Sequence, residues 1–265
     1  FRTHALAPRV VMANTNFVRP SWKTFYELQD KNLTMFAQYT AGPWEYIGTQ
    51  GVIQGTFETL RSIGNLHFAG SLEGRILLTA GMGGMGGNQP RAMTMLGGVT
   101  ICTDVDIEMI HRRLTAGYCD VLATSLDHAI TLGREAAAQK TPLGIAMVGN
   151  AVEVFEECLR RGFRPDIVTD MTPAHDPLSY IPAGYTVEGA NELRRRDRDE
   201  YFRLARASMV RQLTVMNAYH DMGVQAFEYG NQIRRQCDEE GMPDALRIPG
   251  FVAAYIRPLF LEGRG

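Results

Sequence analysis

The stretch Arg75-Ile76-Leu77-Leu78-Thr79-Ala80-Gly81-Met82-Gly83-Gly84-Met85-Gly86-Gly87 decides the fold of this chain. Its first half is an apolar run that predicts a buried strand. The glycine cluster behind it contains the pattern Gly-x-Gly-x-x-Gly at Gly81, Gly83 and Gly86, and residues 89–96 then predict a short helix. Without Cβ atoms, the backbone of such a turn can approach phosphate oxygens closely. The stretch therefore predicts a strand, a phosphate-binding turn and a helix in succession.

Predicted strands and helices alternate along the rest of the chain. Further strands are predicted at 99–103, 120–124, 143–148, 166–169 and 224–227. Helices are predicted at 107–116, 127–139, 152–161 and 191–222, and earlier at 54–63, where Gly64 is the expected stop. Strict alternation implies parallel pairing with right-handed crossovers. We therefore expect an α/β fold with a Rossmann-like, doubly wound parallel sheet.

Composition and charge exclude several kinds of partner. The chain has 45% hydrophobic residues and a formal net charge of −2 at pH 7, so it carries no basic field that would attract nucleic acid. No apolar run approaches the roughly 20 residues of a membrane-spanning helix, and no secretory pattern precedes the first elements. We expect a cytoplasmic protein that binds neither membrane nor nucleic acid.

The cysteines and the two ends of the chain carry further expectations. The four cysteines lie far apart, without a Cys-x-x-Cys pair or a histidine at ligand spacing, which favours ordinary thiols and no metal site. The chain begins at Phe1 rather than Met and stops directly after the apolar run 251–261. We expect that both ends are cut from a longer protein.

A carboxylate follows the glycine pattern at the end of the second predicted strand. Asp104 stands about 20 residues beyond the glycines, where an acidic side chain can accept hydrogen bonds from ribose hydroxyls. An acidic residue at this place favours NAD over its 2′-phosphorylated relative. Strand, helix and carboxylate in register favour a dinucleotide site over a merely flexible turn.

Two later segments follow predicted strands, where open α/β sheets bind ligands. The first is Gly149-Asn150-Ala151, for which a plain helix N-cap at Asn150 is an equally good explanation. The second runs from Asp170 to Asp176 and contains His175 beside Asp176. This pair is a catalytic pair, a satisfied loop histidine or a cofactor contact, and the sequence does not rank the three. The long loop 173–184 favours a functional role.

Several blocks of the chain resemble the urocanase family, and they occur in the family's order over nearly the whole length. The blocks are Tyr39-Thr40-Ala41-Gly42, Tyr46-Ile47-Gly48-Thr49-Gln50-Gly51, residues 79–87, Ala174-His175-Asp176-Pro177-Leu178, Tyr229-Gly230-Asn231 and Ala254-Tyr255-Ile256-Arg257-Pro258-Leu259-Phe260. The resemblance implies a homodimeric cytosolic enzyme of histidine degradation. This enzyme, urocanate hydratase, adds water to urocanate and yields imidazolonepropionate. Its tightly held NAD acts as an electrophile toward the imidazole ring of the substrate.

The resemblance also implies a set of cofactor contacts at matching positions, which the glycine pattern extends by Gly81 and Gly83. The matching positions are Gln38, Gly84, Met85, Gly86, Asp104, Asn150, Ala151, Met171, Thr172, Pro173, Ala174, His175, Tyr180, Ile181 and Tyr229. The chain departs from the family's pattern with Asp104 for the commoner Glu, Met171 for Gln and Met109 for Arg. The last two changes remove polar groups, so we expect altered cofactor geometry or a divergent subfamily.

The resemblance implies a division of the chain into three parts. Residues 1–47 form the N-terminal flank of a core domain, 48–250 the Rossmann-like NAD-binding domain, and 251–265 the return segment to the core domain. The family's active-site cysteine lies beyond the last residue here, and none of the four cysteines matches its motif. We therefore assign no catalytic residue, and we expect this chain alone to bind NAD incompletely and not to turn over urocanate.

Two alternatives stay open. A conventional NAD-dependent dehydrogenase uses the same glycine turn for hydride transfer. A non-catalytic dinucleotide-binding module uses it to sense NAD or to hold a partner.

Overall fold

A computed structural model describes residues 21–31, 33 and 49–263 of the chain. The chain divides into two compact units, residues 1–52 and 53–265. In the first unit, helix α1 (Trp22–Asp30) begins at Ser21, whose Oγ accepts a hydrogen bond from the Thr24 amide at 3.1 Å. The predicted cofactor contact Gln38 lies outside the described residues.

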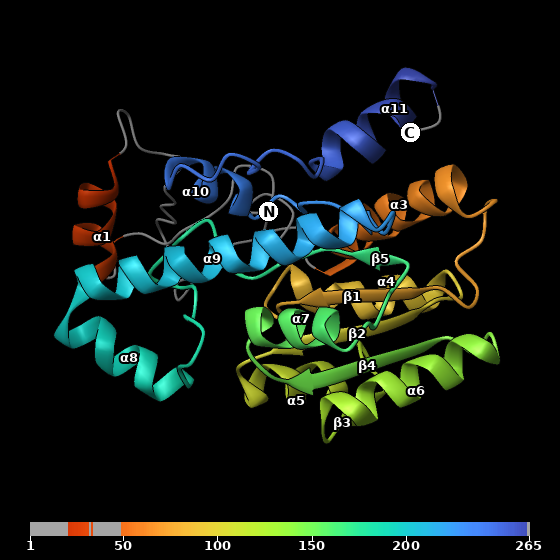
Figure 1. The fold of residues 1–265 in the computed structure, drawn as a ribbon, viewed down its shortest axis with the longest axis horizontal. Coiled ribbons are helices and arrows are strands. Elements are labelled where there is room, and N and C mark those ends of the chain that lie inside the picture. Colours follow the sequence, from red (N-terminus) through yellow and green to blue (C-terminus); the bar gives the residue numbers. More distant parts are fainter. Residues whose placement is uncertain (1–20, 32, 34–48, 264–265) are drawn as a thin grey trace, which may run out of the picture. The chain divides into compact units, whose positions relative to one another are not determined.

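The second unit is built on one sheet, which has six strands within the described residues (Figure 1). All its strand pairs are parallel, in the order β3-β4-β2-β1-β5-β6. The strands are β1 (Ile76–Ala80), β2 (Val99–Asp104), β3 (Val121–Ala123), β4 (Leu143–Val148), β5 (Ile167–Val168) and β6 (Gln225–Ala226). From β1 the chain passes to β2, continues to the edge strand β3 and comes back to β4, and it then crosses past β1 to β5 and β6. The predicted doubly wound parallel sheet is therefore confirmed.

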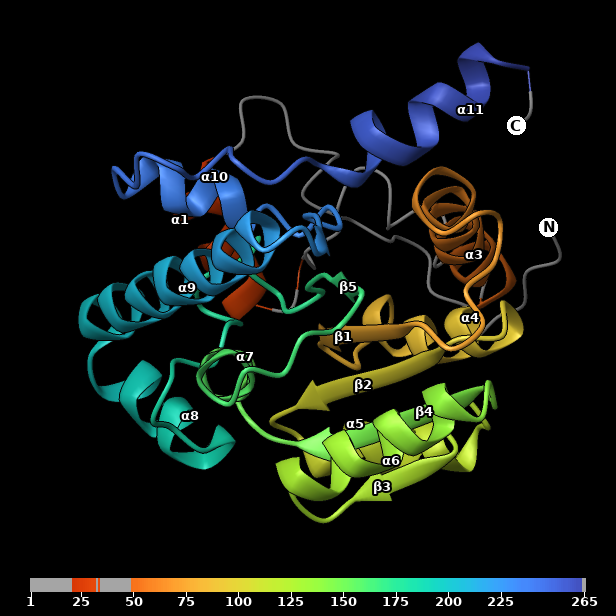
Figure 2. The same cartoon turned by 45° about the vertical axis from the view of Figure 1, so that its right-hand side comes forward.

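Helices cover both faces of this sheet. Figure 2 shows α3 and α4 on one side of β1 and β5, and α7 and α9 on the other side. The helices of the unit, with its 3-10 and π turns, are α3 (Thr49–His67), η2 (Gly86–Asn88), α4 (Gln89–Met95), α5 (Ile107–Thr115), α6 (Leu126–Ala138), α7 (Ala151–Arg160), α8 (Val187–Arg196), α9 (Arg198–Asp221), α10 (Ile233–Glu239), η3 (Val252–Ile256) and α11 (Arg257–Leu261). Each strand is thus followed by helical structure, as parallel pairing requires.

The side chains of successive residues in β2 pack on opposite faces of the sheet. Ile101 packs against α6, where a Cβ added to Gly133 would lie 3.1 Å from the Ile101 Cδ1 atom. Cys102 instead belongs to a buried cluster with Met82 and with Ile110 of α5. Because side chains alternate along a strand, a nearly continuous apolar run is buried on both faces.

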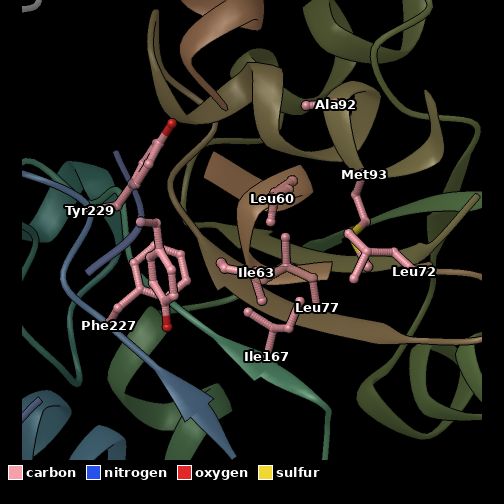
Figure 3. Packing of buried hydrophobic residues seen from close by; sticks show 10 residues of the cluster. Leu60, Ile63, Leu72, Leu77, Ala92, Met93, Ile167, Phe227 and Tyr229 are labelled. Carbon is pink, nitrogen blue, oxygen red and sulfur yellow. The ribbon is translucent and has the colours of Figure 1, made fainter. Parts of the chain in front are cut away.

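One large apolar cluster joins α3 to the sheet (Figure 3). Leu60 and Ile63 of α3 pack there with Leu77 of β1 and Phe227, which follows β6. Tyr255 of the π-helical turn η3 joins this cluster, and its backbone oxygen accepts a hydrogen bond from the Ser62 hydroxyl at 2.9 Å. The start of the predicted return segment 251–265 therefore packs on α3, while its assignment to a core domain stays a prediction.

Two sequence predictions about helices were wrong. Helix α3 continues past Gly64 to His67, and the glycine lets Leu72 approach, because a Cβ there would lie 3.3 Å from the Leu72 Cγ atom. The segment predicted as one helix over 191–222 forms two helices, α8 and α9, separated at Asp197. Asp197 is extended, with φ −149°, and its carboxylate accepts a hydrogen bond from the Glu200 amide at 3.0 Å. Its side chain therefore starts a new helix where the apolar spacing alone predicts continuation.

Replacing Asp197 by Ala removes this N-cap and should lower the free energy of unfolding by about 1 kcal/mol. Urea denaturation of the variant measures the change. Glu192→Ala, at an exposed position within α8, is the matched control and should change stability little. An equal loss in both variants would contradict the capping role.

Candidate functional site

The two loops that flank the topological switch point of the sheet are in direct contact. Strand β1 leads into the glycine loop, residues 81–87, and β5 leads into the loop 169–176. The Met171 amide donates a hydrogen bond to the Ala80 carbonyl at 2.9 Å, so the second loop starts against the end of β1. In open α/β sheets, ligands bind at the carboxyl ends of the strands at this point. The fold therefore brings two of the predicted site segments together.

The three glycines of the pattern meet different surroundings. Gly81 has a left-handed φ of +87°, and a Cβ there would lie 2.5 Å from the Met171 carbonyl oxygen. A Cβ on Gly86 would overlap the carbonyl oxygen of Gly81. A Cβ on Gly83, by contrast, would meet no atom within 4 Å. The fold itself requires the first and third glycines, whereas the second leaves open space above the loop.

Two side chains hold the carbonyl groups of the glycine loop. Arg113 of α5 donates from Nε to the Met82 carbonyl at 3.0 Å and from Nη2 to the Gly83 carbonyl at 2.7 Å. The Asn88 side-chain amide donates to the Gly84 carbonyl at 2.7 Å and to the Met85 carbonyl at 3.2 Å. Four successive carbonyl groups, those of residues 82–85, thus point toward protein donors.

The amide groups of the same peptide units point the other way. In a trans peptide, the carbonyl of one residue and the N–H of the next lie on opposite sides of the bond. The N–H groups concerned are those of residues 83–86, and within the described part of the chain they donate to no protein acceptor. Four neighbouring donors of this kind can bind an anion.

Asp104 anchors the start of the glycine loop. Its Oδ2 accepts a hydrogen bond from the Met82 amide at 2.6 Å, and its Oδ1 accepts one from the Asp106 amide at 2.9 Å. Burial raises the pKa of Asp104, and these backbone hydrogen bonds oppose the rise. Each carboxylate oxygen has a further lone pair and can also accept a hydrogen bond from a hydroxyl group. The contact between Asp104 and ribose therefore stays a prediction, and the free lone pairs of the carboxylate allow it.

Asn150 joins the end of β4 to the later loop around Ile181. Its Oδ1 accepts a hydrogen bond from the Val152 amide at 3.0 Å, so the alternative of a helix N-cap is confirmed. Its Nδ2 donates to the carbonyls of Ile181 and Pro182, at 3.0 and 3.2 Å. Ala151, the first residue of α7, is buried beside it. Asn150 thus links the start of α7, where Ala151 lies, to Ile181, which brings three of the proposed cofactor contacts together.

A buried polar cluster fixes the loop that follows β5. Asp170 is fully buried and accepts hydrogen bonds from the Thr172 amide at 3.0 Å and the Thr172 hydroxyl at 2.7 Å. Asn231 donates from its side chain to the Asp170 carboxylate and to the Thr172 carbonyl. The residues on either side of Asn231, Gly230 and Gln232, both have left-handed φ values, +80° and +65°. A strained turn thus places the side-chain amide of Asn231 against the loop that follows β5.

Burial keeps His175 neutral. It lowers the pKa of the imidazole to about 4, and the nearby Asp176 carboxylate opposes this shift. Asp176 accepts hydrogen bonds from the Leu178 amide at 3.1 Å and the Ser179 hydroxyl at 2.7 Å, so it shapes the turn that follows. At neutral pH His175 is an uncharged group that can donate or accept a hydrogen bond. It cannot serve there as a protonated acid.

Two predicted contacts have their polar ends inside the protein. Tyr180 is buried, and its hydroxyl donates to the Gln212 side-chain oxygen. The Tyr229 hydroxyl donates to the hydroxyl of Thr56 in α3 at 3.0 Å. Both tyrosines stabilise the interior in this structure, and their contacts with a cofactor stay predictions.

The cysteines are protonated at neutral pH. All four, Cys102, Cys119, Cys158 and Cys237, are buried and form no disulfide. Burial raises the pKa of Cys119, Cys158 and Cys237 to about 12, and it also raises the pKa of Cys102 well above its ordinary value. Because the thiolate is the reactive form, none of them is poised as a nucleophile at neutral pH. Among the described residues, no group of three potential ligands is arranged to hold a metal ion.

Four residues of this site have roles that the sequence did not predict. Arg113 and Asn88 hold the glycine loop, and Asp170 and Asn231 hold its neighbour. Only the last two had a local signal, since they stand in the segments 170–176 and 229–231 that follow predicted strands. The contact of Arg113 with the loop joins residues 30 and 31 positions apart and has no local signature.

The doubly wound sheet, with a glycine loop and a carboxylate at its switch point, defines a Rossmann-like α/β protein. Residues 48–255 match the family model of the urocanase Rossmann-like domain, and residues 1–45 match that of the urocanase N-terminal domain. The first match spans more than half of the chain, so this chain belongs to the urocanase family. The resemblance seen in the sequence is confirmed. No helix in the described ranges is long and apolar enough to span a membrane.

The lowered pKa of His175 predicts a specific pH dependence. The folded value of about 4 lies below the ordinary value of 6.5, so the unfolded chain takes up the proton first as the pH falls. Stability contributed by the neutral imidazole is complete above about pH 6.5 and is lost between about pH 6.5 and pH 4. NMR titration, with the signal assigned through His175→Gln, should give a midpoint well below 6. A midpoint above 6 would contradict the burial argument.

Proposed function

We propose that this chain is the NAD-binding part of urocanate hydratase, a hydro-lyase that adds water to urocanate and gives imidazolonepropionate in histidine degradation. Membership in the urocanase family supports the proposal. The observation that carries the cofactor assignment is the open space at Gly83, between two glycines that the fold itself requires.

The residues of the glycine loop fit a dinucleotide. Such a loop needs one glycine for a tight turn, one for access of the pyrophosphate and one for close packing of the following helix. Gly81, with its left-handed backbone, meets the first need, and Gly86, packed on the Gly81 carbonyl, meets the third. Gly83 meets the second. The amides of residues 83–86 supply hydrogen-bond donors for phosphate oxygens, which carry the charge of the ligand.

Charge around the loop favours NAD. The Asp104 carboxylate can accept hydrogen bonds from ribose hydroxyls. It would repel a 2′-phosphate, so binding of the 2′-phosphorylated form of NAD is disfavoured. When bound, NAD supplies an electrophilic nicotinamide ring. The chain's own residues bind the pyrophosphate, orient the ribose and hold the loop 171–175 in place. His175 stays uncharged in that loop at neutral pH because burial lowers its pKa to about 4.

The remaining parts of the proposal rest on the family. We infer a cytoplasmic homodimer that takes urocanate as its small-molecule substrate. The proposed cofactor contacts include Gln38, Tyr180, Ile181 and Tyr229 besides the residues of the switch point. We assign no catalytic residue within this chain, because burial keeps the thiols protonated.

Substitution of Gly83 tests the phosphate-binding loop. Gly83→Ala puts a methyl group into the open space where phosphate oxygens would approach, so the affinity for NAD should fall at least about tenfold, or ~1.4 kcal/mol. Isothermal titration calorimetry measures the affinity. Gly55→Ala, where a Cβ also meets no atom within 4 Å, is the matched control and should bind NAD normally. Unchanged affinity in Gly83→Ala would show that the loop is not the phosphate site.

Turnover distinguishes the hydratase from a dehydrogenase. When the protein as the cell makes it is supplied with urocanate, the absorbance of urocanate should fall and the absorbance of NADH should not rise. A substrate-dependent rise of NADH absorbance would instead favour hydride transfer. Binding of NAD without consumption of any substrate would favour a non-catalytic module.

A further inference from the structure

We propose that Arg113 and Asn88 are positioning residues that orient the backbone of the glycine loop toward the pyrophosphate of the cofactor. The inference rests on the proposed function and adds to it the two side chains on which anion binding depends. Neither residue need touch the ligand. Each acts through the carbonyl groups that it holds.

Arg113 reaches the loop from another element. It lies in the last turn of α5, and its guanidinium lies 5.5 Å from the ring centroid of Tyr118. The planar fork of arginine presents Nε and Nη2 in a fixed geometry, which matches two successive carbonyl oxygens, those of Met82 and Gly83. A lysine carries the same charge but lacks this fork.

Gly87 gives an independent sign that the arrangement is built into the chain. This glycine lies outside the Gly-x-Gly-x-x-Gly pattern. A Cβ at this position would overlap Nε of Arg113 and would lie 2.7 Å from its Cζ. The missing side chain of Gly87 therefore makes room for the guanidinium beside the loop.

Asn88 completes the arrangement from inside the protein. Its side chain is 1% exposed, and one amide nitrogen bridges the carbonyls of Gly84 and Met85. Together the two side chains hold four carbonyl oxygens, which would repel a phosphate if they faced it. Turning them toward the protein turns the four N–H groups of residues 83–86 toward the side away from these donors. The Gly83 and Met85 carbonyls also accept hydrogen bonds from the Gly87 and Asn88 amides at 3.0 and 3.2 Å, so the two side chains set the hydrogen-bonding direction of the loop together with the turn that follows it.

The Arg113→Lys variant tests this role because it keeps the charge and removes the fork. We expect its affinity for ADP-ribose, which carries the pyrophosphate, to fall about tenfold or more, while its affinity for adenosine stays unchanged. Asn88→Leu, which is close in size and uncharged and which removes both donated hydrogen bonds, should show the same loss of ADP-ribose binding. Arg112→Lys, at the exposed neighbouring position of α5, is the matched control and should bind both ligands normally. Calorimetry gives the affinities, and thermal unfolding monitors the fold.

The outcomes separate the inference from the proposed function. If the unaltered protein, as the cell makes it, binds neither NAD nor ADP-ribose, the proposed function fails. If it binds ADP-ribose and Arg113→Lys binds it equally well, the positioning role alone is overturned. An equal loss of adenosine and ADP-ribose binding would reveal a general structural role and would also overturn it. The same holds if both variants lose their unfolding transition, since the two side chains would then be holding the fold.

Discussion

The site depends on one steric constraint, the close approach of backbone to backbone where β1 ends. Gly81 turns with a left-handed φ against the Met171 carbonyl, and Gly86 returns onto the carbonyl of Gly81. Neither contact leaves room for a Cβ. The constraint brings the glycine loop into contact with the loop that follows β5, so the two halves of the doubly wound sheet meet at their carboxyl ends. Every other feature of the site is arranged around this contact.

Buried polar groups hold the loops in the conformation that the contact requires. Asp104 fixes the Met82 amide of the glycine loop, Arg113 and Asn88 hold the carbonyls of this loop, and Asp170 with Asn231 fixes the loop beside it. A buried polar group is costly unless it is hydrogen-bonded, and each of these five groups makes at least one hydrogen bond to backbone. The backbone is thereby held rigidly, which is what a preorganised binding site needs.

Local patterns were sufficient for the elements of the sheet. The apolar run of β1 and the similar run of β2 are buried on both faces, and such runs bounded by glycine are typical of parallel strands. Where prediction failed, a single residue overrode the pattern. Asp197 interrupts an apolar periodicity with a cap, and Gly64 remains inside a helix that packs on Leu72. Helix ends are decided by hydrogen bonds and packing that periodicity does not encode.

The sequence by itself determined the alternation of strands and helices, the glycine turn with its carboxylate at Asp104, and the resemblance to the urocanase family. These features are local, because they depend on residue type and spacing along one stretch of chain. Only the tertiary structure decided that Gly83 alone among the three pattern glycines faces open space, and that Arg113 and Asn88 orient the loop. It also decided that the tyrosines at 180 and 229 direct their hydroxyl groups into the protein. Apart from the contacts of Asn88, which reach only three and four residues back, these facts depend on which atoms of distant segments meet after folding, and spacing along the chain carries no record of them.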